Sequence, residues 1–130
     1  MRYLCLIYEN EKQWESLPPA ETEVIMNEYF AFTGDIQKNG KYVAGEALQP
    51  TPTATTVRVR NGKVSTTDGP FAETKEQLGG FYLIEAKDLN DAIQVASRIP
   101  SARFGSVEVR PVIDFSKEAA KQEQAAATTA

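Results

Sequence analysis

The sequence predicts an α+β fold on the ferredoxin-like βαββαβ plan, with an inserted β-hairpin, for a chain of 130 residues. Three observations support this prediction. Apolar runs of strand length alternate with segments whose apolar residues recur at helical spacing. An Asn-Gly pair between two alternating segments is typical of a tight hairpin. Elements in the order strand, helix, strand, hairpin, strand, helix, strand follow the plan with one insertion.

The first predicted strand covers residues 3–8, an almost unbroken apolar run that indicates burial on both faces of the sheet. Cys5 is the only cysteine and lies in this run, so the chain has no intrachain disulfide. We interpret its thiol as a small buried hydrophobe and not as a nucleophile. Cysteine usage of this kind favours a reducing, cytoplasmic compartment.

The first predicted helix follows a polar stretch around Trp14 and runs over residues 19–39. Its apolar stripe, with helical spacings, consists of Ile25, Tyr29, Phe32 and Ile36. Pro19 suits the first helical turn, where a missing N–H costs nothing, and Gly40 suits the left-handed stop after Asn39.

Residues 42–48 predict the second strand, and two prolines after it indicate a loop. Residues 55–60 and 63–67 alternate around Asn61-Gly62, a pair whose left-handed dihedral angles match the twist of a two-residue hairpin turn. This hairpin is the clearest local signal in the chain.

The second half of the chain repeats the pattern of strand, helix and strand. Residues 79–85 predict a buried strand, preceded by a polar loop or short helical turn over residues 72–77. Asp88 suits the cap of a second helix, which ends at Pro100, and residues 104–113 predict the last strand.

Two helices cover only one face of such a sheet, although the other face also carries large apolar residues. We therefore expect an identical subunit to cover the second face, which makes the protein a homodimer. The domain is expected to span residues 1–115. Residues 116–130 lack an apolar stripe and predict a frayed helical or disordered tail without catalytic content.

Composition excludes several classes of function. The chain has no histidine, which removes histidine-based catalytic triads and, with a single thiol, nearly all zinc sites. Acid–base chemistry would fall to carboxylates, tyrosines or lysines, and we predict neither a metal site nor a cofactor. A net charge of -4 disfavours direct binding to nucleic acid, and no apolar stretch reaches the length of a membrane span.

The turn Asp68-Gly69-Pro70-Phe71 is the first candidate ligand-binding site. A turn with glycine and proline beside an aromatic ring can present a carboxylate and backbone amides rigidly to a small molecule. We predict a cavity between the sheet and this turn, with the four residues at its edge. In the alternative interpretation, Asp68 bonds only within its own turn and Phe71 fills the core.

Glu46 is the second candidate, because it lies within the apolar strand predicted over residues 42–48. Desolvation raises the pKa of a carboxylate that points into a sheet cavity, and a raised pKa suits a general base. Strand alternation equally allows the opposite orientation, toward solvent. Glu46 and Asp68 are therefore the candidate catalytic residues if the protein is an enzyme.

The predicted hairpin carries a basic patch on an otherwise acidic domain, formed by Arg58, Arg60 and Lys63. Such a patch could meet an anionic substrate or the acidic surface of a partner protein. Solvated decoration of the hairpin is the commoner explanation. A third interpretation is an arm that wraps the sister subunit and so protects its own free edges.

Five segments of the sequence resemble the YCII-related family, specifically its DGPF-motif branch. They are residues 1–8, 43–48, 66–76, 78–82 and 107–111. The resemblance covers roughly residues 1–113, and the block from Asp68 to Tyr82 is too specific for a chance match. It implies a dimeric α+β barrel built from ferredoxin-like subunits, which agrees with the order of the predicted elements.

The same resemblance implies a small-molecule-binding or regulatory module. The DGPF branch is often associated with extracytoplasmic-function sigma factors, so a sigma factor or another regulatory protein is the implied partner. Some members of the wider family are similar to small lyases in which a histidine on the first helix pairs with an aspartate, and that histidine has no counterpart here. The alternative function is a lyase- or isomerase-like enzyme that uses Glu46 or Asp68 as its acid or base.

Overall fold

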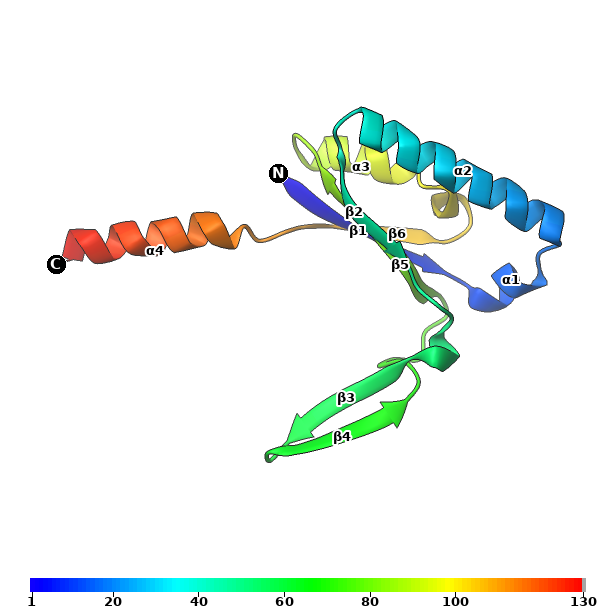
Figure 1. Ribbon diagram of the computed structural model, residues 1–130, viewed down its shortest axis with the longest axis horizontal. Helices are drawn as coiled ribbons and strands as arrows, with labels where there is room; N and C mark the ends of the chain where they lie inside the picture. The colour runs from blue at the N-terminus through cyan, green and yellow to red at the C-terminus, as the bar shows by residue number, and fades with distance from the viewer. Residues whose placement is uncertain (130) are drawn as a thin grey trace.

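A four-stranded antiparallel sheet with helices on one face forms the body of the protein in the computed structural model, which describes residues 1–129 (Figure 1). The elements are β1 (Arg2–Glu9), α1 (Glu11–Ser16), α2 (Pro19–Lys38), β2 (Tyr42–Ala47), the 3₁₀ turn η1 (Thr51–Thr53), β3 (Thr55–Arg60), β4 (Lys63–Asp68), β5 (Gln77–Glu85), α3 (Leu89–Ser97), the 3₁₀ turn η2 (Pro100–Arg103), β6 (Ser106–Pro111) and α4 (Phe115–Thr129). The strand order β2-β5-β1-β6 is that of the ferredoxin-like plan, which confirms the predicted fold class.

Alternation along β1 separates the two faces of the sheet. Tyr3, Cys5 and Ile7 are buried against the helices, while Leu4 and Leu6 lie half-buried on the helix-free face. Cys5 is 0% exposed, and its burial raises the pKa of the thiol to about 11. The interpretation of Cys5 as a structural residue is therefore confirmed.

The stripe predicted for the first helix packs on the sheet as expected. Phe32 and Ile36 are buried in the core, and the Phe32 ring meets Tyr82 of β5 edge-on, with 5.2 Å between the ring centroids. The helix ends one residue earlier than predicted, and Gly40 then adopts a φ of 71°. Tyr29 lies half-buried on the same helix.

Besides η1, which forms in the loop predicted after the second strand, two short helical elements were not predicted. The polar stretch around Trp14, for which no element was predicted, forms α1. Asn10 caps this helix by accepting hydrogen bonds from the N–H groups of Lys12 and Gln13 at 3.0 and 3.3 Å. The last strand begins at Ser106 instead of residue 104, because the N–H groups of residues 104 and 105 donate to Ser101 O and so close the turn η2. Both elements lie at the edges of the helix layer and help to shape the site described below.

The predicted hairpin forms as β3 and β4, with φ values of 53° at Asn61 and 76° at Gly62 that confirm the two-residue turn. It makes a sheet of its own and projects away from the body (Figure 1). Its register places Val59 opposite Val64, and both are exposed, at 55% and 70%.

The C-terminal segment is helical, so of the two alternatives for the tail the structure supports the helical one. This helix, α4, extends away from the body at the end of the molecule opposite to α1 (Figure 1). None of the helices within residues 1–129 has the length and apolar character needed to cross a membrane.

Candidate functional site

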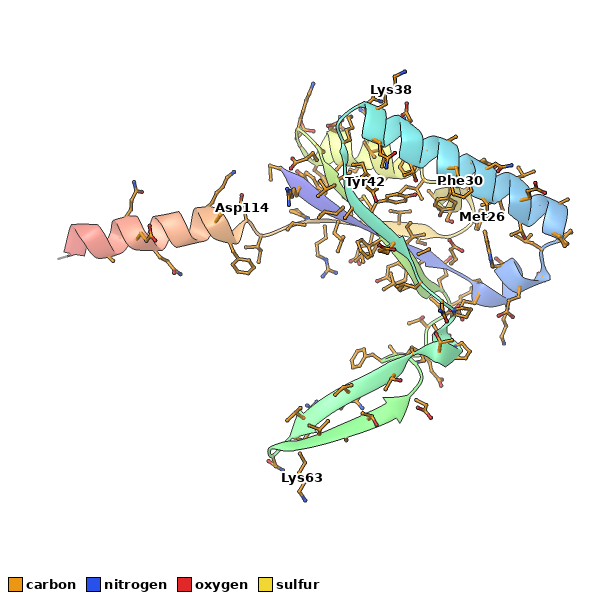
Figure 2. All side chains as sticks on the ribbon, viewed as in Figure 1. Met26, Phe30, Lys38, Tyr42, Lys63 and Asp114 are labelled. Atoms are coloured by element: carbon orange, nitrogen blue, oxygen red, sulfur yellow. The ribbon has the colours of Figure 1, made fainter. Side chains whose placement is uncertain are left out.

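A cavity of about 490 Å³ lies between the sheet and the helices α1 and α2. Its apolar wall includes Ile7, Trp14, Met26, Tyr29, Phe30, Tyr42 and Tyr82. Met26 and Phe30 extend from the side of α2 that faces the strands (Figure 2). The volume and the mainly aromatic wall are typical of a site for a small organic molecule.

Two polar residues of the lining, Glu9 and Tyr29, are joined by hydrogen bonds through Ser101, which lies buried behind the wall. Ser101, at 0% exposure, donates from Oγ to Oε1 of Glu9 at 2.5 Å, and the hydroxyl of Tyr29 pairs with the same Oγ. The hydroxyl hydrogen of Ser101 is engaged by Glu9, so Tyr29 must be the donor to Ser101. The direction of the whole chain is therefore fixed, from Tyr29 through Ser101 to Glu9.

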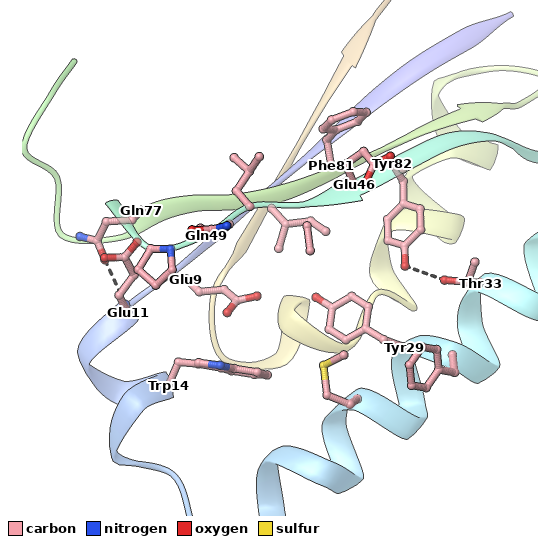
Figure 3. A pocket seen from close by; sticks show the side chains of 18 of the residues that line it. Glu9, Glu11, Trp14, Tyr29, Thr33, Glu46, Gln49, Gln77, Phe81 and Tyr82 are labelled. Atoms are coloured by element: carbon pink, nitrogen blue, oxygen red, sulfur yellow. Dashed lines mark hydrogen bonds between the residues drawn. The ribbon is translucent and has the colours of Figure 1, made fainter. Parts of the chain in front are cut away.

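Burial sets the ionisation of two tyrosines that line the cavity, Tyr29 and Tyr82. Burial raises the pKa of Tyr29 to about 12, with the hydrogen bond to Ser101 as a smaller opposing effect. Burial also raises the pKa of Tyr82, whose hydroxyl pairs with Thr33 at 2.7 Å (Figure 3). Both phenols are consequently neutral at physiological pH and serve as hydrogen-bonding groups.

Helix α1 is held in place as one end of the cavity. The Glu11 carboxylate accepts hydrogen bonds from the backbone N–H and the hydroxyl of Thr51, at 2.8 and 2.7 Å. The backbone N–H of Glu11 donates to Oε1 of Gln77 at 3.0 Å. These bonds tie α1 to η1 and to β5. Trp14, carried by the same helix, is thus fixed across the cavity from Glu9 (Figure 3).

The charged groups of the lining are all acidic: Glu9, Glu11, Glu15 and Glu46. None of the described residues that line the cavity is a lysine or an arginine. Over the part of the chain that the structure describes, no three His, Cys, Asp or Glu side chains gather in a way that could hold a metal ion.

Glu46 contributes to the lining, but its side chain does not point among the helices. In the register of β2 with β5 it is opposite Phe81, whereas its neighbour Gly45 is opposite Tyr82. Tyr82 faces the helices, so alternation places Glu46 on the helix-free face, where it is exposed (Figure 3). Of the two orientations left open by the sequence, the structure shows the one toward solvent.

The turn Asp68-Gly69-Pro70-Phe71 is not part of the cavity lining, so the prediction that it forms the cavity edge is wrong within one chain. The Gly69 N–H donates to Ala54 O at 2.8 Å, and Thr56 donates from Oγ1 to Gly69 O at 3.0 Å. The turn therefore closes the base of the projecting hairpin and leaves the body of the sheet.

Phe71 does not fill the core either. It is 80% exposed and lies beneath the guanidinium of Arg58, 5.8 Å from the ring centroid, so the alternative interpretation of this residue is also wrong. Asp68 is exposed at the end of β4, apart from the lining to which Glu46 belongs. The ligand-binding role assigned to the turn stays a prediction.

Neither Glu9 of the lining nor Ser101 behind it was predicted from the sequence. Glu9 carried a usable signal, because strand alternation places it on the same face as Cys5 and Ile7. Ser101 had no such signal in the sequence, because it simply follows Pro100, at which the predicted helix ends. Only the fold brings it close to Glu9. Tyr29 was predicted as a core aromatic, and its hydroxyl is the part that matters here.

Comparison with known proteins gives two matches. The family described as the YCII-related domain matches residues 1–116. An uncharacterized protein of Rhizobium meliloti (strain 1021) is 39% identical over 114 residues, which cover 86% of this chain and 92% of that protein.

Proposed function

The chain belongs to the YCII-related family, and on that premise we propose that it is a dimeric module that binds a small molecule and acts in regulation. The observation that carries the proposal is the cavity of about 490 Å³ beneath the sheet. It combines an aromatic wall with the hydrogen-bonded chain of Tyr29, Ser101 and Glu9. A few placed polar groups in an apolar pocket are what orient a small ligand.

An enzyme that uses Glu46 and Asp68 together has no geometric support. Glu46 points away from the helix layer and Asp68 lies at the end of the hairpin, so the two carboxylates do not flank a common space in one chain. The binding function is therefore the one that we carry forward.

The dimeric part of the proposal is supported by the helix-free face of the sheet. Leu4 and Leu6 of β1 lie opposite Leu83 and Phe81 of β5, which places four large apolar side chains together at its centre. No helix within residues 1–129 covers them (Figure 1). A second copy of the chain would bury this patch and complete a barrel of two sheets.

For the regulatory role, the proposed partner is a sigma factor that binds through protein–protein contacts. A net charge of -4 opposes approach to the phosphates of DNA. The exposed basic patch of Arg58, Arg60 and Lys63 lies on the projecting hairpin, with Lys63 near its tip (Figure 2). This arm offers an acidic partner surface a complementary site.

Filling the cavity tests the binding function. Ala47 lines the cavity from β2, so Ala47→Phe should place a ring inside it. We expect the affinity for Nile red, an uncharged apolar dye, to fall by about tenfold or more in a fluorescence titration. A tenfold loss of affinity corresponds to about 1.4 kcal/mol of binding free energy. The control Ala31→Phe adds the same ring to an exposed position of α2 outside the lining and should bind as the unmodified protein does.

Equal dye binding by Ala47→Phe and the unmodified protein would contradict the proposal. A circular dichroism spectrum of each variant establishes that it is folded. If Ala47→Phe does not fold, Met26→Trp narrows the same cavity from the α2 side and provides the same comparison.

A further inference from the structure

Glu9 and Tyr29, which the buried Ser101 joins, offer only hydrogen-bond acceptors to a ligand in the cavity. The Ser101 hydrogen is directed to Glu9 and the Tyr29 hydrogen to Ser101. What remains for a ligand is the second carboxylate oxygen of Glu9 and the free lone pair of the Tyr29 phenol, both of which are acceptors. A ligand group that satisfies them must carry N–H or O–H hydrogens.

The charge of the wall restricts this group further. The ionised groups of the described lining are carboxylates, and Glu9 is the one that reaches into the space between the sheet and α2 (Figure 3). An anionic ligand group would therefore meet like charge without a lysine or arginine in the lining to balance it. A cationic group would form a charge-assisted hydrogen bond with Glu9.

The aromatic side chains around Glu9 favour the same sign of charge. Trp14 lies across the cavity from Glu9, and Tyr29 lies beside it (Figure 3). The face of an aromatic ring carries partial negative charge and attracts cations, with tryptophan the most effective. The acceptors, the net charge and the rings are three separate features of one wall, and all three fit a cation.

We propose that the cavity binds an organic amine in its ammonium form, with the charged nitrogen between Glu9 and Tyr29 and an apolar body against Trp14 and Met26. This inference rests on the proposed function, because it names the ligand class of the same cavity. The burial of Tyr29 and the fixed direction of its hydrogen keep the phenol oxygen available as an acceptor.

Three probes that share a phenyl-ethyl skeleton test the inference: phenethylammonium, phenethyl alcohol and phenylacetate. We expect isothermal titration calorimetry with the full chain to give at least about tenfold tighter binding of the ammonium than of the alcohol, as for a charge-assisted hydrogen bond. Phenylacetate should bind more weakly than either. An ammonium that binds no more tightly than the alcohol overturns the inference.

The variant Glu9→Gln keeps the size of the side chain and removes its charge. It should weaken phenethylammonium binding by about tenfold or more and leave the alcohol unchanged. The matched control is Glu23→Gln, at an exposed position of α2 outside the lining, which should change neither. Unchanged ammonium binding by Glu9→Gln also overturns the inference. If this variant does not fold, Tyr29→Phe removes one acceptor and should weaken the ammonium selectively.

The two proposals fail in different ways. If Nile red binds and Ala47→Phe prevents it, the cavity is a binding site, and the absence of an ammonium preference then refutes only the ligand class. If neither Nile red nor any of the three phenyl-ethyl probes binds, the proposed function itself is refuted.

Discussion

At the scale of single residues, Ser101 joins parts of the chain that are far apart in sequence. It is the buried polar side chain of the core, and it links Glu9 at the end of β1 with Tyr29 on α2. A buried hydroxyl with both a donor and an acceptor partner is stable, while its loss would leave two polar groups unpaired. The hydrogen-bonded link between Glu9 and Tyr29 depends on this one residue.

Burial of Cys5 and Tyr29 predicts a loss of stability at alkaline pH. Burial raises the thiol pKa from 9.0 to about 11 and the phenol pKa from 10.0 to about 12. The native state keeps protons that the unfolded chain has released, so the free energy of unfolding should fall as pH rises from 9.0 to about 12. Below that window these two groups should have no effect on its pH dependence.

Urea denaturation at a series of pH values measures this slope. Cys5→Ala removes one of the two groups, so its free energy of unfolding should fall less steeply between pH 9.0 and about 11, whatever its value at neutral pH. A free energy of unfolding in the unmodified protein that stays constant across this window would show that neither group is shifted as described.

At the scale of elements, Gly105 allows β6 to reach the sheet. A Cβ at this position would lie 2.2 Å from the carbonyl oxygen of Tyr8 on β1, closer than any real contact. The Gly105 N–H also donates to Ser101 O at 2.7 Å, which joins η2 to the start of the strand. The close approach of two backbones is thus what positions the Ser101 turn beside Glu9.

Two glycine substitutions test this account. Gly105→Ala should lower the free energy of unfolding by about 1–3 kcal/mol or more, as overpacking does. Gly34 lies in α2, and a Cβ added there would have nothing within 4 Å. Gly34→Ala should therefore raise the free energy of unfolding by about 0.5–1 kcal/mol, because alanine is the better helix former. Urea denaturation compares the two, and equal effects would contradict the importance of the β1–β6 approach.

At the scale of the whole molecule, the helix-free face predicts a homodimer. Light scattering at micromolar concentration should give about twice the chain mass of 14.3 kDa. Leu6→Lys places a charge at the centre of this face and should give the single-chain mass. The control Val24→Lys charges an apolar residue that is 58% exposed on α2 and should leave the dimer intact. A single-chain mass for the unmodified protein would refute the dimer.

The hairpin provides a second test of the same assembly. Its register separates a valine face, with Val57, Val59 and Val64, from the basic patch on the other face. An exposed two-stranded hairpin needs cover, so wrapping of the sister subunit should use the valines. Replacing them with serine should weaken the dimer. Replacing Arg58, Arg60 and Lys63 with serine should instead leave the dimer intact and reduce binding of a purified sigma-factor partner.

The sequence by itself determined the features that depend on local interactions. Apolar runs predicted strands of the main sheet, alternation around Asn61-Gly62 predicted the hairpin, and the stripe ending in Phe32 and Ile36 predicted α2. In each case the residues that specify the element lie within one turn or a few positions of each other. Their order along the chain was then sufficient for the ferredoxin-like plan.

Only the tertiary structure decided the site. Glu9 and Ser101 are 92 residues apart and meet because β6 packs on β1, a contact that no local pattern encodes. The turn at Asp68 had the stronger local signal, but it lies at the base of the hairpin that projects from the body (Figure 1). Its backbone closes the hairpin, because the Gly69 N–H donates to Ala54 O. Local propensity shows what a segment can form, whereas the position of a side chain in a cavity depends on long-range packing of all the elements together.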